Sequence, residues 1–288
     1  SSFSAGLIYI FSPIVFTRVI AGHFYWLIAY SLSPFILAGF LKGKEENRNK
    51  YFIISGLLLC IAIVQLQFIV MLLIVLLVFC LVDFRHIKKG LLGMSIIFSI
   101  VFLVNVCPVI LSQFIMIPDL PFNPTQLSTV ISQTNLLPGF RLLGWDNPGI
   151  GYSYTNLGTP TDTFSKMNAD MIPSWIFILD FLLPITAFSA LLVRRDKYTI
   201  SFAIISLMGL FLLKGFYPPL TQVSKFLFLT VFFVFRDTWT TSFVYAFASA
   251  ILAAIFIEKI KSFGHTNIMF KAIFPIILVS LLVISGGY

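Results

Sequence analysis

An uncharged apolar tract of 32 residues, from Tyr51 to Val82, limits the possible folds of this chain more than any other feature. A second uncharged tract runs from Leu91 to Ile117. Soluble domains carry about 25% charged residues, whereas this chain of 288 residues is 10% charged and 59% hydrophobic, with a mean hydropathy of +1.00. A helix needs about 20 apolar residues to cross a bilayer. The sequence therefore predicts an all-α polytopic membrane protein, with a single transmembrane domain over residues 1–288.

Nine apolar segments are expected to cross the membrane as helices. The tract 51–82 is expected to cross twice, with a tight turn at Gln65–Gln67, because basic residues flank both of its ends. The nine predicted segments are 3–17, 24–41, 51–64, 68–82, 91–115, 173–193, 199–213, 240–257 and 269–285.

The positions of the basic residues set the orientation of these segments. Cytoplasmic loops of membrane proteins are enriched in Lys and Arg, and 13 of the 19 Lys and Arg residues lie in four patches between apolar segments, at 42–50, 85–89, 194–197 and 259–271. No contiguous basic face is present, so the sequence excludes nucleic acid as a partner. We expect a multi-pass protein of the cell membrane whose active side is extracytoplasmic. The other six basic residues are placed on that side: Arg18, Arg141, Lys166, Lys214, Lys225 and Arg236.

The only long hydrophilic segment, residues 116–172, is also predicted to be extracytoplasmic. It is rich in Asn, Thr, Ser, Gly, Pro and aromatic residues, and its "DNPG" and "PG" sequences indicate turns. Two interpretations stay open: a loop that covers a cavity suited to sugar rings, and a loop that rests on lipid headgroups. The chain has no initiator Met and stops at "SGGY" just after an apolar run, so we expect a fragment of a longer protein.

Several kinds of chemistry are not indicated by the sequence. Cys60, Cys80 and Cys107 lie inside apolar segments without paired spacing, which favours apolar packing over disulfides or a zinc site. The motifs of serine hydrolases, zinc proteases, P-loop proteins and dinucleotide-binding proteins are absent from the sequence. No metal ligands are predicted, and the cofactor stays open, a divalent metal included.

The strongest candidate site is the pair Arg236–Asp237 within "VFFVFRDTWTTSF". The uncharged stretch before it is too short to cross the bilayer, so 214–237 is predicted to be a re-entrant or interfacial element that lines an extracytoplasmic cavity. Arg236, Lys214 and Lys225 are the candidate ligands for phosphate oxygens, because guanidinium groups bind them in a bidentate manner and lysines add positive charge. Asp237 is a candidate for orienting Arg236 or for catalysis. A structural ion pair, or an arginine that reaches the membrane surface, is the competing interpretation.

Two further positions complete the candidate site. Arg18 and His23 lie at the outer turn of the first predicted hairpin and are candidates for substrate binding. Asp180 lies within an apolar segment, where a carboxylate requires an inward-facing cationic partner such as Arg18, Lys214 or Arg236. We assign Asp180 and Asp237 as catalytic candidates.

Short motifs of the chain resemble large polytopic glycosyltransferases of the GT-C class, the archaeal and bacterial relatives of the mycobacterial arabinofuranosyltransferases and of YfhO-like proteins. The run "SPIVFTRVIAGHFYWLIAYSLSP" is similar to their "NP-x-x-x-x-R-x-x-x-G" stretch, and "KGFYPP" with "VFRDTW" is similar to their "K-G…vFR-[DE]-P-x-K-F" element. The final "SGGY" is similar to their "S-G-x-Y-P". The matched positions are Pro13, Arg18, Gly22, Tyr30, Pro34, Lys214, Gly215, Phe235, Arg236 and Asp237.

The resemblance implies an enzyme that transfers a sugar from a polyprenyl-phosphate donor to a glycan or protein outside the cell, with membrane lipid around it. Thr238 replaces the usual proline after Arg-Asp, and the following lysine is missing. GT-C enzymes usually carry a catalytic carboxylate in the first extracytoplasmic loop; here it either precedes Ser1 or the chain is not catalytic. The alternatives are a transporter or flippase of an anionic lipid-linked substrate and a non-catalytic scaffold subunit. A transporter is disfavoured because internal repeats and paired broken helices are not evident.

Overall fold

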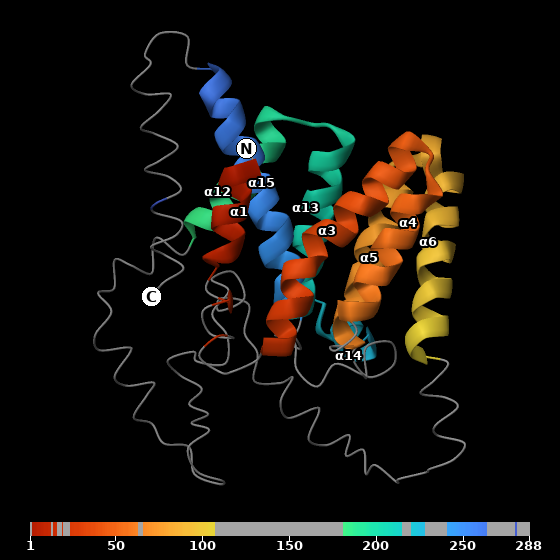
Figure 1. Cartoon of the computed structure of the whole chain (residues 1–288). Coiled ribbons are helices and arrows are strands. Elements are labelled where there is room, and N and C mark those ends of the chain that lie inside the picture. Colours follow the sequence, from red (N-terminus) through yellow and green to blue (C-terminus); the bar gives the residue numbers. More distant parts are fainter. Residues whose placement is uncertain are drawn as a thin grey trace, which may run out of the picture. The chain divides into compact units, whose positions relative to one another are not determined.

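All the secondary structure that the structure describes is helical. In this computed structural model no strand occurs among the described residues, and the chain divides into two compact units, His23–Ser128 and the remainder, Ser1–Gly22 with Thr129–Tyr288 (Figure 1). We call them the four-helix unit and the α15 unit. The described residues are 2–12, 14, 15, 19, 24–62, 66–106, 181–214, 220–227, 241–263 and 280.

The four-helix unit is built from helices that alternate in direction. Its elements are α3 (Phe24–Glu46), α4 (Asn49–Ala62), α5 (Leu66–Val82), η1 (Phe84–His86), α6 (Ile87–Val101) and the π-helical segment η2 (Phe102–Val106) that continues α6.

Contacts between the helices fix these directions. Ser55 Oγ on α4 donates a hydrogen bond to the Ile36 carbonyl of α3 at 3.0 Å, and Gly43, farther along α3, faces Phe52, which is earlier in α4, so the two helices are antiparallel. Asn105 Nδ2, in the η2 segment that continues α6, donates a hydrogen bond of 3.4 Å to the Cys60 carbonyl near the end of α4, so α6 and α4 end on the same side. The helices α3 and α5 therefore run in one direction, and α4 and α6 run in the other.

Small residues allow these helices to approach closely. Gly39 and Gly43 form a G-x-x-x-G pair on α3, and a Cβ atom added at Gly43 would lie 2.8 Å from the ring of Phe52. Such pairs favour helix association in a bilayer, where lipid chains compete with apolar side chains and close backbone packing becomes important. The ring of Phe52 is buried between Gly43 of α3 and Gly93 of α6, so α4 is held from both sides.

The α15 unit is organised around one long central helix. Its elements are α1 (Ser2–Ile10), α12 (Leu182–Val193), α13 (Lys197–Leu213), α14 (Thr221–Phe226) and α15 (Ser242–Phe263), and α1, α12 and α13 all pack against α15 (Figure 1).

The packing of α13 on α15 is close and antiparallel. Ser206 Oγ and Ser249 Oγ are 3.0 Å apart in a buried hydrogen bond, and Gly209 lies against the backbone of Tyr245. Because higher numbers on α13 meet lower numbers on α15, the chain leaves α13 and enters α15 at the same end of this unit.

The helices agree in position with the described parts of eight predicted segments. The tract 51–82 contains two helices, as predicted, since α4 ends at Ala62 and α5 begins at Leu66. The predicted turn at Gln65–Gln67 is wrong for Leu66 and Gln67, which belong to α5, and Gln65 lies outside the described residues. By length and composition alone, three helices among the described residues are able to cross a membrane, Phe24–Glu46, Phe84–Asn105 and Ser242–Ile260, and four apolar helices are shorter. The predicted loop 116–172, and the ninth segment 269–285 apart from residue 280, lie outside the described residues.

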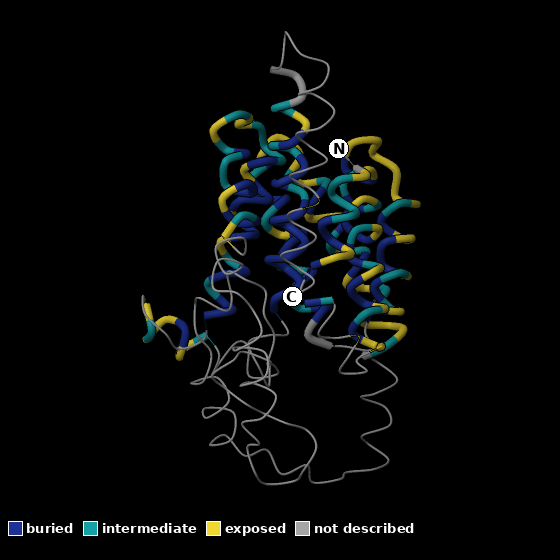
Figure 2. Tube along the Cα trace, turned by 90° about the vertical axis from the view of Figure 1, so that its left-hand side faces the viewer, coloured by how far each residue is buried: buried dark blue, intermediate teal, exposed yellow. Residues whose placement is uncertain are grey.

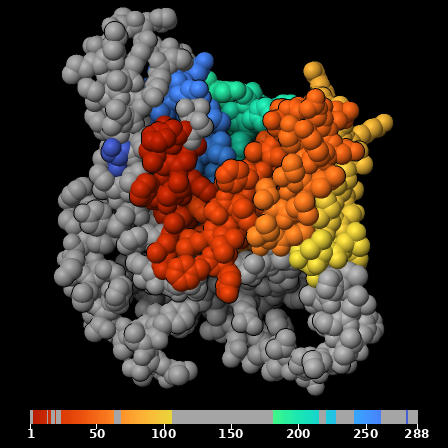
Figure 3. Space-filling model, viewed as in Figure 1, coloured from red at the N-terminus to blue at the C-terminus, as the bar shows by residue number. Residues whose placement is uncertain are grey.

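Apolar side chains cover the outer faces of the helices. Along each helix, exposed positions alternate with buried ones (Figure 2). In the space-filling view, the side chains of α3 to α6 pack against one another (Figure 3). Exposed apolar residues on this scale are typical of a surface that contacts lipid. On α4 and α6 they include Ile53, Ile54, Leu57, Ile61, Leu91, Leu92 and Phe98.

Candidate functional site

A buried lysine lies where α13 ends. Lys214 follows the last residue of α13 and is 2% exposed. Its Nζ donates a hydrogen bond to Ser224 Oγ at 2.8 Å and lies 4.6 Å from the centre of the Phe211 ring. Ser224 belongs to α14, which begins directly after Leu220, a residue with a left-handed φ of 60°. The lysine therefore ties the short helix α14 to the end of α13.

Lys225, another predicted ligand, is exposed on α14 beside Ser224. Of the seven predicted site residues, the structure describes two, Lys214 and Lys225, and Lys225 directly follows the serine that binds Lys214. Because Lys214 is buried and Lys225 is exposed, Lys225 is the one of these two that is accessible to an anionic ligand such as a phosphate. The other five, Arg18, His23, Asp180, Arg236 and Asp237, lie outside the described residues, so their placement stays a prediction.

The Lys214 end of the α15 unit lies opposite its basic patches. Lys197 opens α13 at the other end, and the antiparallel packing of α15 places Lys259 near that end too. Asp196 caps α13 there, where its Oδ1 accepts a hydrogen bond from the Thr199 backbone N–H at 2.8 Å. The patches at 194–197 and 259 therefore share one end of this unit, as predicted, and Lys214 is at the other.

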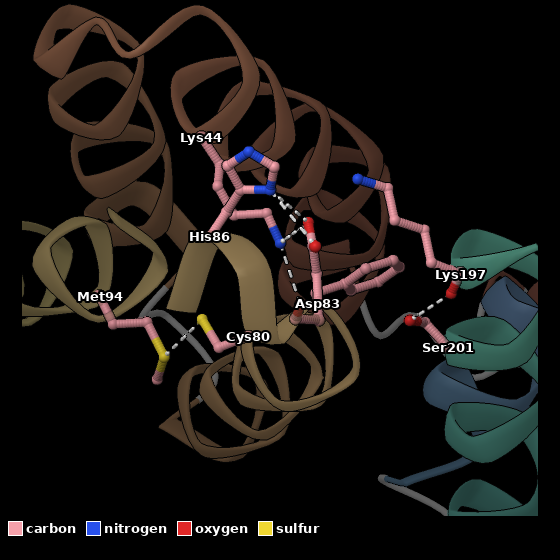
Figure 4. A network of polar contacts seen from close by, with 8 residues as sticks. Lys44, Cys80, Asp83, His86, Met94, Lys197 and Ser201 are labelled. Carbon is pink, nitrogen blue, oxygen red and sulfur yellow. Dashed lines mark hydrogen bonds and ion pairs between the residues drawn. The ribbon is translucent and has the colours of Figure 1, made fainter. Parts of the chain in front are cut away.

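A second charged cluster lies in the four-helix unit (Figure 4). Lys44 Nζ is 3.0 Å from Asp83 Oδ2 and donates a hydrogen bond to the Phe79 carbonyl, also at 3.0 Å. The side chains of Lys44 and Asp83 are only 3% and 9% exposed, respectively. His86 Nδ1 lies 3.3 Å from the same carboxylate and reaches the surface. Lys44 is in the last turn of α3, and Asp83 and His86 follow α5, so the cluster joins two helix ends.

Sequence reasoning missed this cluster. Lys44 was grouped with a solvent-facing patch, and Asp83 and His86 were not singled out. A usable indication was present, because Asp83 is the charged residue that ends the long apolar tract, and a carboxylate at that depth requires a cation. The pair also places the patches 42–50 and 85–89 at one end of the four-helix unit, which agrees with their predicted common side.

Neither cluster has the composition of a metal site. Among the described residues, no group of three or more His, Cys, Asp and Glu side chains is placed to hold a metal ion. Cys80 Sγ, near the Lys44–Asp83 pair, lies 3.7 Å from Met94 Sδ, and Cys60 and Cys80 are free thiols. Cys80 is buried on α5, Cys60 is partly buried on α4, and Cys107 lies outside the described residues.

The described residues define a class: an all-helical protein, with helices long and apolar enough to cross a membrane and with charged side chains at the helix ends. This is the pattern of an integral membrane protein. Comparison with known proteins gives nothing more specific, since no family model, no curated protein and no solved structure matches the chain.

Proposed function

We propose that the chain is an integral membrane glycosyltransferase that moves a sugar from a polyprenyl-phosphate-linked donor to an extracytoplasmic glycan or protein. The observation that carries the proposal is the 2.8 Å hydrogen bond from Lys214 Nζ to Ser224 Oγ. It holds Lys225 and the buried Lys214 at the end of the α15 unit that lies away from the basic patches. Two cations at one end of a membrane helix bundle suit the phosphate of a lipid carrier.

The chain around this end supports the inclusion of Arg236 and Asp237 in the same site. Both residues closely precede α15 in the sequence, and α15 begins at the end where α13 stops. The end of α13 and the start of α15 therefore lie at one end of this unit, which supports the proposed re-entrant element 214–237. In the proposed site, Lys225, Arg236, Arg18 and His23 bind the donor phosphate, the buried Lys214 holds α14 in place beside them, and Asp237 and Asp180 hold these cations or assist transfer.

A nine-span topology with cytoplasmic basic patches is part of this proposal. It is supported by the shorter helices, each of which packs against one of the three long ones. Cysteine substitutions at Asn47 and at Gly149 test it with a thiol reagent that does not cross the membrane. Labelling from outside is expected at Gly149 and not at Asn47, and the reverse result would overturn the topology.

Sugar transfer tests the function directly. Membranes that contain the protein are supplied with a panel of radiolabelled polyprenyl-phosphate pentoses and hexoses, and label in acceptor material is measured. Hydrogen bonds to charged groups contribute about 1.5–3 kcal/mol, so Arg236→Ala is expected to lower transfer at least about ten-fold. Arg236→Lys keeps the charge but loses the bidentate geometry, so it should lower transfer more than thermal stability. Lys259→Gln, at the opposite end of the α15 unit, is the matched control.

Wild-type rates for both Arg236 variants would show that the anion site is wrong. Uptake or flipping of the donor without transfer would support the transporter alternative. A protein that neither transfers nor moves any donor, and in which the charges of the Lys214 end are individually dispensable, would be the scaffold subunit.

A further inference from the structure

The basic end of the four-helix unit is assembled from two separate stretches of sequence, 42–50 and 83–89. The buried Lys44–Asp83 pair fixes the end of α3 against the end of α5, and η1 leads directly into α6. This arrangement brings six basic side chains to one end of the unit, of which five are exposed and Lys89 is half-exposed. We call them the basic surface: Lys42, Arg48, Lys50, Arg85, Lys88 and Lys89.

The charge of this surface is only partly compensated. Residues 42–50 and 83–89 carry seven basic and three acidic side chains, a net charge of +4, and one acid, Asp83, is buried with Lys44. Glu46 is shared between Lys42 and Arg48, each at 3.7 Å. Among the described residues, no ion pair involves the cations that follow α5, namely Arg85, Lys88 and Lys89.

Exposed apolar side chains directly adjoin these cations. Phe84, next to Arg85, is 72% exposed, and Leu91 and Leu92 follow Lys89 on α6 with about half of their surface exposed. On α4, Ile53 and Ile54 follow Lys50 in the same way. In a bilayer this boundary between apolar and basic side chains lies where the acyl chains meet the headgroups.

From this boundary we propose that the basic surface binds the headgroups of anionic phospholipids, with Phe84 and the adjoining leucines in contact with their acyl chains. The arginines offer bidentate hydrogen bonds to phosphate oxygens, and the lysines add charge. A nucleic acid or a soluble acidic protein would leave the apolar edge without a partner, whereas a lipid satisfies both halves of the surface. The buried ion pair holds the two stretches together before the lipid binds, so little ordering is required on binding.

Photocrosslinking tests this proposal at the surface itself. The whole chain is reconstituted in phosphatidylcholine nanodiscs with increasing fractions of a phosphatidylglycerol that carries a diazirine near its headgroup. Adducts are mapped by mass spectrometry, and those on 84–92 are compared with those on 194–200 in the same sample. Wild-type protein should show preferential adducts on 84–92, and this preference should weaken at high salt.

Matched triple variants separate charge from structure. In R85Q/K88Q/K89Q each lost charge should weaken binding about five-fold, so the apparent affinity should fall about 100-fold. R85K/K88R/K89R keeps all three charges and should bind within a few-fold of wild type. Unchanged adduct yield in the Gln variant would overturn the proposal. So would displacement of the lipid by soluble glycerol 3-phosphate at equal concentration, which would indicate a site for free phosphate.

If the Gln variant does not fold, the salt series on the wild-type protein decides the question. A preference for 84–92 that is insensitive to ionic strength would overturn the electrostatic basis of the proposal, and a preference that falls with salt would support it.

Discussion

Breaking the Lys44–Asp83 pair is expected to destabilise the four-helix unit strongly, while replacing both partners is not. The perturbations are Lys44→Met, Asp83→Leu and the double variant. Each single change leaves one charge buried without its main partner, and removal of one member of a buried pair typically destabilises by about 3–5 kcal/mol. Apolar replacement of both members is often neutral or stabilising.

The contacts rank the two single variants. After Lys44→Met, the Asp83 carboxylate still has His86 Nδ1 at 3.3 Å, so this variant is expected near 3 kcal/mol. After Asp83→Leu, the ammonium of Lys44 keeps the Phe79 carbonyl, which has no net charge, so this variant is expected near 5 kcal/mol. The double variant is expected within about 1 kcal/mol of wild type, which makes the coupling energy large.

Unfolding in mild detergent gives the measurement, with a thiol-reactive dye as the probe. Cys80 is fully buried between α5 and α6, close to the pair, so its labelling reports the opening of this unit. Denaturant midpoints for the four proteins yield the double-mutant cycle. A double variant as unstable as the sum of the single variants would refute the reasoning, because the two side chains would then contribute independently.

Three further predictions concern the α15 unit. A Cβ atom at Gly209 would lie 2.8 Å from the Tyr245 backbone nitrogen, so Gly209→Ala should lower stability by about 1–3 kcal/mol in thermal unfolding followed by circular dichroism, while Gly6→Ala, with no atom within 4 Å, should not. Ser224→Ala removes the hydroxyl that accepts the hydrogen bond of Lys214, so it should lower the free energy of unfolding by about 1–3 kcal/mol. Ser31→Ala, at an exposed serine, is the control and should leave this free energy unchanged. Burial raises the pKa of Asp196, but hydrogen bonds from Thr199 and the Arg194 guanidinium outweigh this effect and hold the pKa below its ordinary value of 3.8. The stability that Asp196 contributes should therefore be complete above about pH 4 and be lost as pH falls through the lower folded-state pKa. Asp196→Asn should remove this pH dependence and keep the helix cap. If Asp196→Asn leaves the acid sensitivity of unfolding unchanged, the assignment is wrong.

Helix positions were predictable from the sequence, since apolar tracts bounded by charged residues and turns are long-range patterns that survive without tertiary information. The end of α3 could not be predicted in this way. The segment was predicted to stop at residue 41, yet α3 continues to Glu46, where Lys42 and Glu46 form an i, i+4 ion pair at 3.7 Å. This extension carries Lys44 from a loop into a helix turn that faces α5.

Partners across the fold are the part that sequence reasoning could not supply. Nothing local indicates that Lys44 meets Asp83 rather than the adjacent Glu45 or Glu46, because the choice depends on which side of α3 packs against α5. Lys214 was predicted as a site residue from its charge, its place in the element 214–237 and the resemblance of "KGFYPP", but its hydroxyl partner depends on the left-handed turn at Leu220. In both cases the pairing is set by helix packing and chain reversal, which single-sequence patterns do not encode.

Helix direction within each unit groups its own basic residues at one end. In the four-helix unit, α3 and α5 run toward the basic end and α6 runs away from it; in the α15 unit, α12 ends at the basic patch that starts α13. The Lys44–Asp83 pair sets this grouping in the first unit, and the antiparallel packing of α13 on α15 sets it in the second. Each unit by itself therefore has the charge distribution that the positive-inside rule predicts for residues 42–50 with 85–89 and for 194–197 with 259.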